Sequence, residues 1–320
     1  MGSRLYRPPC NVCVIYNPAS GRGRSARRLV GLRRAWAEHA VFWPTTAPGQ
    51  AEELALQAAQ AEFAIVAAAG GDGTVHEVAN GLLRAKRPEA TLAIVPTGSA
   101  NDYACCLGLD THWWQRDDPA IRSQAVDVGI IRAGGKSRYF VNGVGLGFNG
   151  MVTEESRRIG WLQGVALYGL ALLRTLCLRY ELIPMSIRMD DKQRQAPTLA
   201  LSVALGRREG NFVVAPQAVL DDGLFDYIHV GPLRRRDLAY LLPILFRGRG
   251  LPHDYPNLWL GRCRQVRIHA ESPVVVHTDG ELFCVSADGV RDLEIDLLPK
   301  ALRVLGKFPG SPNPGMKAAS

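Results

Sequence analysis

The sequence predicts two parts: a doubly wound α/β domain with a parallel sheet, followed by an antiparallel β-sandwich. In the first part, short apolar runs typical of buried parallel strands are followed by glycine-rich turns and helical patterns. From about residue 124, short alternating or β-branched runs replace this alternation, which favours a sandwich. These runs are 125–132, 137–142, 185–189, 199–205, 224–230, 266–269, 274–277 and 293–297. A chain of 320 residues is long enough for two hydrophobic cores. Because the pattern changes near residue 124, we place the domain limits at 10–124 and 125–297.

A glycine-rich turn links the apolar run 63–69 to a helical pattern over 75–83. Its glycines let the backbone approach an anion, and the first N–H groups and the dipole of the helix favour negative charge, so the turn predicts a phosphate site. An acid in such a turn repels phosphate unless a cation lies between them, which indicates Mg²⁺-dependent chemistry. The alternative is a plain tight turn with an acid at the helix N-terminus. The motif consists of Gly70, Gly71, Asp72, Gly73 and Thr74.

Two further strand-to-helix turns occur in the same half. The run 12–16 leads into residues 17–24, after which Ser25 can cap a helix. The run 92–95 leads into residues 96–102, where Ser99 and Asp102 are spaced as a capping box. Because ligands of an open parallel sheet lie at the carboxyl ends of its strands, we expect the three turns to form one polar crevice.

In this order, the three turns resemble the diacylglycerol kinase and sphingosine kinase family of lipid kinases, in particular its soluble bacterial members. Residues 142–148, 220–226 and 278–281 also fall in that family's order and spacing, so the resemblance covers residues 10 to 305. It implies an N-terminal domain akin to phosphofructokinase and NAD kinase, a C-terminal β-sandwich, and a segment at 298–308 that returns to the first domain. One departure is Thr97-Gly98-Ser99, where many relatives have Leu-Gly-Thr. Ser99 keeps the hydroxyl, so we expect its phosphate contact to survive.

The resemblance implies ATP and Mg²⁺ as cofactors. Asp72 and Asp102 are expected to organise metal and water around the phosphates. The phosphates themselves are expected to contact the glycines of the 70–74 turn, Thr74 and Ser99. The residues implied to line the nucleotide pocket are Asn17, Pro18, Ala19, Ser20, Gly21 and Thr45.

Asp279 follows the apolar run 274–278 and precedes a glycine, so a tight turn presents its carboxylate. The residues alone favour an acid of a hairpin turn. The resemblance instead implies the general base that takes the proton of the attacking hydroxyl. It also implies a structural Mg²⁺ held by Asp222 and the backbone carbonyls of Val219 and Leu224, because hard cations prefer oxygen ligands. Glu281 is left without a role, and the seven histidines are taken as structural or surface residues.

The stretch 159–173 is apolar but interrupted by glycines and a glutamine, so it does not predict a membrane-spanning helix. We expect a helix that covers an acyl-chain pocket, and an ordinary core helix is the alternative. Its large apolar residues are Trp161, Leu162, Val165, Leu167, Leu170, Leu172 and Leu173.

The net charge is +8, with 32 arginines against 6 lysines. Such a surface is either simply solvated or attracts anionic lipid headgroups, and no motif for nucleic-acid binding is present. The chain lacks a secretory signal pattern, and its seven scattered cysteines favour free thiols in a reducing compartment. We therefore expect a cytoplasmic protein that associates transiently with the inner face of the membrane.

Together these features predict an ATP-dependent lipid kinase of phospholipid metabolism, acting on a hydroxyl of a membrane-derived lipid such as diacylglycerol. A kinase of a soluble substrate such as NAD and a catalytically silent lipid-binding protein are the alternatives. The sequence leaves open which lipid is phosphorylated, whether the membrane patch is 159–173 or the arginine-rich surface, and whether the chain forms a homodimer.

Overall fold

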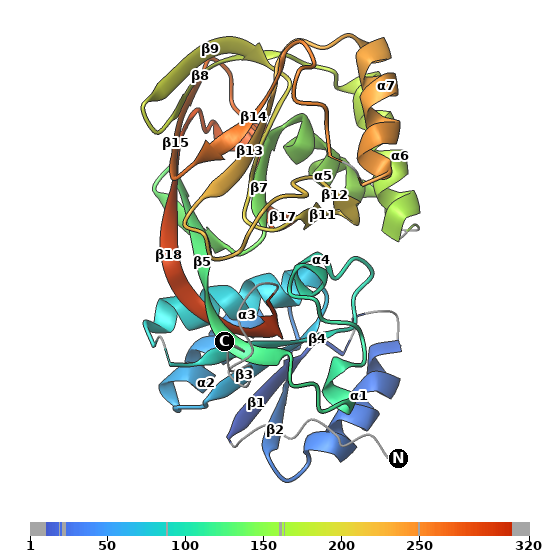
Figure 1. Cartoon of the computed structure of the whole chain (residues 1–320), viewed down its shortest axis with the longest axis vertical. Coiled ribbons are helices and arrows are strands. Elements are labelled where there is room, and N and C mark those ends of the chain that lie inside the picture. The colour runs from blue at the N-terminus through green and yellow to red at the C-terminus, as the bar shows by residue number, and fades with distance from the viewer. Residues whose placement is uncertain are drawn as a thin grey trace, which may run out of the picture.

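A computed structural model describes residues 11–18, 20, 24–87, 89–159, 162, 164–248 and 250–308. Figure 1 shows two lobes stacked along the long axis of the molecule, with β5 (Ile121–Ala133) and β18 (Asp292–Lys307) running between them. Both strands continue without a break through the predicted limits at 124 and 297.

The first lobe contains a parallel sheet in the order β2-β1-β3-β4. Every residue of β3 and β4 is buried, as expected for strands covered on both faces. Helix α3 packs tightly on α2 at Gly81, where a Cβ would lie only 2.2 Å from the carbonyl oxygen of Glu52. The elements are β1 (Val12–Tyr16), α1 (Arg24–Trp36), β2 (Ala40–Pro44), α2 (Gln50–Gln60), β3 (Ile65–Gly70), α3 (Asp72–Ala85), β4 (Thr91–Pro96) and the short α4 (Asp102–Cys106).

The second lobe is an antiparallel β-sandwich. Its first sheet continues the parallel sheet through β18, which pairs with β4 in parallel and with β5 in antiparallel orientation. This sheet also contains β6 (Lys136–Phe140), β8 (Ile183–Met189), β9 (Lys192–Thr198) and β15 (Gln265–Ala270). The second sheet has the order β14 (Leu258–Cys263), β13 (Phe225–Val230), β10 (Ala200–Ala204), β7 (Gly143–Gly147), β16 (Val276–Thr278) and β17 (Glu281–Cys284). The predicted two-part fold class is confirmed.

Three helices and a small hairpin lie beside the second sheet. The helices are α5 (Phe148–Arg158), α6 (Gly164–Leu178) and α7 (Arg235–Phe246), and the hairpin consists of β11 (Arg208–Glu209) and β12 (Phe212–Val213). Leu172 and Leu176 of α6 pack with Leu238 and Leu241 of α7 in one apolar cluster, and the two helices lie at the same edge of the lobe (Figure 1). In the part of the chain that the structure describes, no helix has the length and apolarity needed to cross a bilayer.

Candidate active site

The turns after β3 and β4 touch each other through two glycines. A Cβ at Gly98 would lie 2.5 Å from the Cα of Gly71, so neither turn leaves room for a side chain at the contact. The predicted capping box of Ser99 and Asp102 is wrong: the helix begins after Asn101, whose left-handed backbone gives no side-chain cap. The Asn101 side chain instead exchanges hydrogen bonds of 2.9 and 3.0 Å with the backbone of Gly98. Ser99 is left exposed, where a ligand can reach it.

Asp72 and Asp102 begin the two helices that follow these turns. Asp72 accepts a long hydrogen bond of 3.4 Å from the backbone of Tyr103, and the Asn211 N–H lies 3.1 and 3.2 Å from the two oxygens of Asp102. Burial raises the pKa of Asp72. Burial and the nearby charge of Asp72 raise the pKa of Asp102 to about 6. A cation would relieve this repulsion, so the pair fits Mg²⁺ shared with substrate phosphates.

Asp279 lies in the β16–β17 turn, with a left-handed backbone (φ 51°). One carboxylate oxygen accepts hydrogen bonds from the backbone N–H groups of Asn142 (2.8 Å) and Gly143 (2.9 Å). The other accepts from the Val141 N–H (3.0 Å) and lies 2.8 Å from Nδ1 of His76. Although burial alone would raise the pKa of Asp279, these donors lower it.

His76 connects Asp279 to the first lobe. The Arg138 guanidinium donates from Nε to Nε2 of His76 at 2.9 Å, so the ring proton sits on Nδ1 and points to Asp279. Arg138 is held in turn by Glu52 at 2.5 Å. The sequence interpretation missed this role of His76. Its signal is the spacing of four residues from Asp72, which puts both side chains on one face of α3.

The described residues that were predicted to line the nucleotide pocket lie at the carboxyl ends of β1 and β2. The Ser20 hydroxyl lies 3.1 Å from that of Thr97, and Asn17 and Thr45 are joined to neighbouring strands through their backbones. A cavity of about 110 Å³ lies here, lined by Tyr16, Asn17, Pro18, Leu29, Leu32, Ala69, Val95 and Thr97. Ala19 and Gly21 lie outside the described residues.

Two predicted phosphate ligands have neighbours that the sequence did not indicate. Thr74 is buried, and its hydroxyl oxygen occupies the space a Cβ of Gly70 would need, at 2.2 Å. The Thr74 side chain therefore packs against the backbone of Gly70. A Cβ at Gly73 would meet the carboxylate of Glu281 at 2.7 Å, and Glu281 is ion-paired with Arg157. Glu281 thus lies against the turn of residues 70–74.

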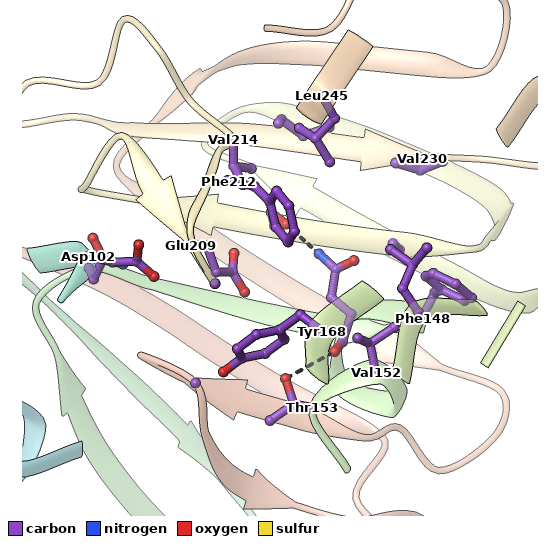
Figure 2. Close-up of a pocket in the computed structure, with 18 of the residues that line it drawn as sticks. Asp102, Phe148, Val152, Thr153, Tyr168, Glu209, Phe212, Val214, Val230 and Leu245 are labelled. Atoms are coloured by element: carbon purple, nitrogen blue, oxygen red, sulfur yellow. Dashed lines mark hydrogen bonds between the residues drawn. The ribbon is translucent and has the colours of Figure 1, made fainter. Parts of the chain in front are cut away.

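A large cavity of about 210 Å³ runs from this acidic centre into the second lobe (Figure 2). Asp72, Asp102 and Asp279 line it at one end. The other part is apolar and is formed largely by α5, α7 and the second sheet. Its apolar lining includes Phe148, Val152, Leu172, Val230, Leu238, Leu241, Leu242 and Leu245.

The predicted source of this apolar lining was mostly wrong. From the stretch 159–173, Leu172 and Tyr168 line the cavity, whereas Leu167 and Leu170 do not. Leu173 faces outward and is 55% exposed. Trp161 and the Val165 side chain lie outside the described residues. Helix α7 contributes four leucines with helical spacing, Leu238, Leu241, Leu242 and Leu245, which the sequence interpretation did not include.

Asp222, the predicted ligand of a structural Mg²⁺, is already paired with an arginine. The Arg262 guanidinium lies 3.2 Å from Asp222 and 3.5 Å from Asp226, and the Leu224 N–H donates to Asp222 at 3.1 Å. Within the described residues, no cluster of three or more His, Cys, Asp or Glu side chains is arranged to hold a metal ion. Mg²⁺ at Asp222, Val219 and Leu224 stays a prediction that requires Arg262 to move.

Comparison with known proteins agrees with this arrangement. The diacylglycerol kinase catalytic domain matches residues 11–133, and the YegS C-terminal NAD kinase beta sandwich-like domain matches residues 142–306. A protein of Chromohalobacter salexigens named "Probable lipid kinase YegS-like" is 32% identical over 275 residues, covering 84% of this chain and 86% of that protein. The diacylglycerol kinase of Bacillus subtilis is 29% identical over 282 residues, covering 84% of this chain and 88% of that protein.

The fold is also shared with a solved structure. A diacylglycerol kinase from Bacillus anthracis superposes with a TM-score of 0.65 at 22% identity, covering 92% of this chain and 96% of that one. The resemblance noted in the sequence is confirmed. The chain belongs to the diacylglycerol kinase family of lipid kinases, which includes the YegS-like proteins.

Proposed function

We propose that this protein transfers the γ-phosphoryl group of ATP to a hydroxyl of a membrane-derived lipid. The observation that carries the proposal is the apolar cavity whose one end is lined by Asp72, Asp102 and Asp279. A lipid hydroxyl can reach these carboxylates while its acyl chain stays among apolar side chains. A dinucleotide phosphate would find little there to hold it, because burying a charge without a partner is unfavourable.

The first lobe would bind ATP and position its phosphates for the transfer. The backbone at Gly70, Gly71 and Gly73, with the α3 N-terminus, would receive the phosphates, and the exposed Ser99 hydroxyl is within the same crevice. The cavity beside Asn17 would take part of the nucleoside. Mg²⁺ held with the phosphates by Asp72 and Asp102 would neutralise their charge.

On the acceptor side, Asp279 would orient the lipid hydroxyl and take its proton. Its lowered pKa keeps it ionised at neutral pH. A strong base is not needed in phosphoryl transfer, because the transition state is loose and most of the rate comes from positioning.

Lipid access would come from a peripheral contact with the cytoplasmic face of the membrane. Leu173 and Leu178 on α6 are 55% and 73% exposed, and Tyr240 on α7 is 59% exposed. Arg174 and Arg236 lie on the same two helices, with side chains 50% and 74% exposed. Apolar side chains among cations bind anionic lipid surfaces.

Two neighbouring residues of α6 provide a matched test. Leu172→Asp puts a charge into the apolar cavity and should lower kcat/KM for lipid ~10²-fold, with ATP binding unchanged. Leu173→Asp changes an outward side chain and should weaken sedimentation with anionic vesicles, with little effect on a lipid presented in detergent micelles. Labelled ATP and a total lipid extract identify the acceptor. Efficient phosphorylation of NAD, with no lipid labelled and both variants like wild type, would contradict the proposal.

A further inference from the structure

One carboxylate lies inside the cavity without a role in the proposed phosphoryl transfer. Glu209 in β11 lines the cavity, and in Figure 2 it lies between Asp102 and the apolar side chain of Phe212. Its side chain is 27% exposed. It therefore sits where the acidic centre gives way to the apolar lining, which is where the headgroup of a bound lipid would lie.

Glu209 is supported from behind by a buried histidine. Nε2 of His277 lies 2.8 Å from a Glu209 oxygen, and the imidazole is 1% exposed. Nδ1 of His277 accepts the Gly280 N–H at 3.3 Å, so the ring proton is on Nε2. The ring fits because residue 145 is glycine, where a Cβ would lie 2.2 Å from Nε2.

The contact between His277 and Glu209 leaves the carboxylate open to a ligand. Although the two atoms are close, Nε2 of His277 has no hydrogen-bond partner of good geometry among the described residues. The two atoms are therefore in contact but poorly aligned for a hydrogen bond, so the carboxylate can still accept one from a ligand. The side chain of Tyr168 also lines the cavity.

A carboxylate accepts hydrogen bonds and donates none, so the group that satisfies Glu209 must be a donor. The ester oxygens of a diacylated glycerol are acceptors only, and its single hydroxyl is the one that reacts. Such a lipid would cover Glu209 without pairing it, and an unpaired buried carboxylate is unfavourable. A lipid with a second hydroxyl or a protonated amine would pair it, and the amine would form the stronger, charge-assisted bond.

We infer that Glu209 selects acceptor lipids whose headgroup carries a second hydrogen-bond donor beside the hydroxyl that is phosphorylated. This inference rests on the proposed lipid kinase function. It names a specificity residue and a class of acceptor, which includes amino alcohols and lipids with a polyol headgroup.

Three lipids in mixed micelles test it: sphingosine (an amine and two hydroxyls), monooleoylglycerol (two hydroxyls) and dioleoylglycerol (one hydroxyl). The wild type should show kcat/KM at least ~10-fold higher for one or both of the first two than for the third, one lost charge-assisted bond being worth that factor or more. Glu209→Gln should reduce this preference at least ~10-fold and leave ATP binding unchanged. Glu294→Gln, a carboxylate of β18 with a 55% exposed side chain, is the matched control and should keep the preference.

The outcomes separate the inference from the function on which it rests. Loss confined to sphingosine in Glu209→Gln assigns the amine, and loss for both polar lipids assigns the hydroxyl; either supports the inference. A wild type that uses dioleoylglycerol as well as the others, or a preference unchanged by Glu209→Gln, overturns the inference and leaves the kinase function standing. A wild type that phosphorylates none of the three and labels no species in a total lipid extract overturns both.

Discussion

The hydrogen-bonded chain from Glu52 through Arg138 and His76 to Asp279 makes one substitution pair informative. In His76→Asn, the amide nitrogen can take the place of Nδ1 and still donate to Asp279, while the acceptor for Arg138 is lost. In His76→Gln, the amide reaches the place of Nε2, so the contact with Arg138 is kept and the donation to Asp279 is lost. The two variants therefore separate the two ends of the imidazole.

The expected loss of stability follows from the hydrogen bonds that Asp279 accepts. Asp279 is buried and has four donors, and a hydrogen bond to a charged group contributes about 1.5–3 kcal/mol. His76→Gln should lower the free energy of unfolding by ~2 kcal/mol, or the melting temperature by about 3 °C. Because the lowered pKa of Asp279 stabilises the fold above the unfolded pKa near 4, the loss should be complete at neutral pH and shrink as the pH falls through the folded pKa.

The turnover of the same two variants tests whether His76 positions Asp279 for catalysis. His76→Gln raises the pKa of Asp279 and frees its carboxylate to rotate, so kcat should fall ~10-fold or more with little change in the affinity for ATP. His76→Asn should keep most of kcat. Urea unfolding from pH 7 to below pH 4, where Asp279 begins to take up a proton, tests the stability, and kcat measured across pH tests the turnover. Equal behaviour of the two variants, or a wild-type kcat in His76→Gln, would refute the positioning of Asp279 by His76.

Three further predictions follow. Asp279→Asn should reduce turnover ~10²-fold and also destabilise the fold, because its amide N–H₂ would face the donors of Val141 and His76; retained turnover would reassign the base. If Mg²⁺ binds at Asp222, added Mg²⁺ should raise the melting temperature of Arg262→Ala more than that of wild type, and an equal response would place the ion elsewhere. Burial lowers the pKa of His229 to about 4, so about 3 kcal/mol of stability present above the unfolded pKa near 6.5 should be lost between pH 6.5 and 4, measured by urea unfolding against a His229→Gln control that lacks this loss.

The first lobe could be predicted from sequence because its signals are local. Strands β1, β3 and β4 are short apolar runs, and the turns after β3 and β4 carry glycines, Gly71 and Gly98, that meet where a side chain would not fit. Strand β2, with its half-exposed residues, was not predicted. The contact of Gly71 with Gly98 was not visible, since it joins turns of different strands. It nevertheless follows from the rule that used these turns to predict a crevice: carboxyl ends of parallel strands meet.

The second lobe was predicted less completely, for identifiable reasons. Strand β7 has the sequence Gly-Val-Gly-Leu-Gly, and glycine is depleted in strands, so propensity argues against it. Tertiary contacts decide instead: a Cβ at Gly147 would lie 2.6 Å from the carbonyl oxygen of Leu199, and Gly145 accommodates His277. Helix α7 contains Pro243, which masks a helical pattern. Its leucines at 238, 241, 242 and 245 carry the period that would have revealed it.

The candidate site shows the same division. The acids Asp72, Asp102 and Asp279 stand out in turns, and the structure brings them to one end of one cavity. The groups that tune them are far away in sequence: Arg138 lies 62 residues from His76, and Asp279 lies 203 residues from it. Such pairs have no periodicity and no motif, so a single sequence gives no reason to associate them.

Asp279 accepts hydrogen bonds from both lobes, so substitutions of its hydrogen-bond donors should affect both stability and turnover. Three of its donors are backbone N–H groups just before and at the start of β7 in the sandwich, and the fourth donor is His76 from the first lobe. In the proposed kinase, a carboxylate held from both sides would set the position of the acceptor hydroxyl relative to the turn of residues 70–74. Loosening either side would therefore move the reacting groups apart as well as weaken the fold, because the same four contacts would serve stability and alignment. For this reason we expect stability and turnover to fall together in variants of this network, and turnover alone to fall in variants of the apolar cavity.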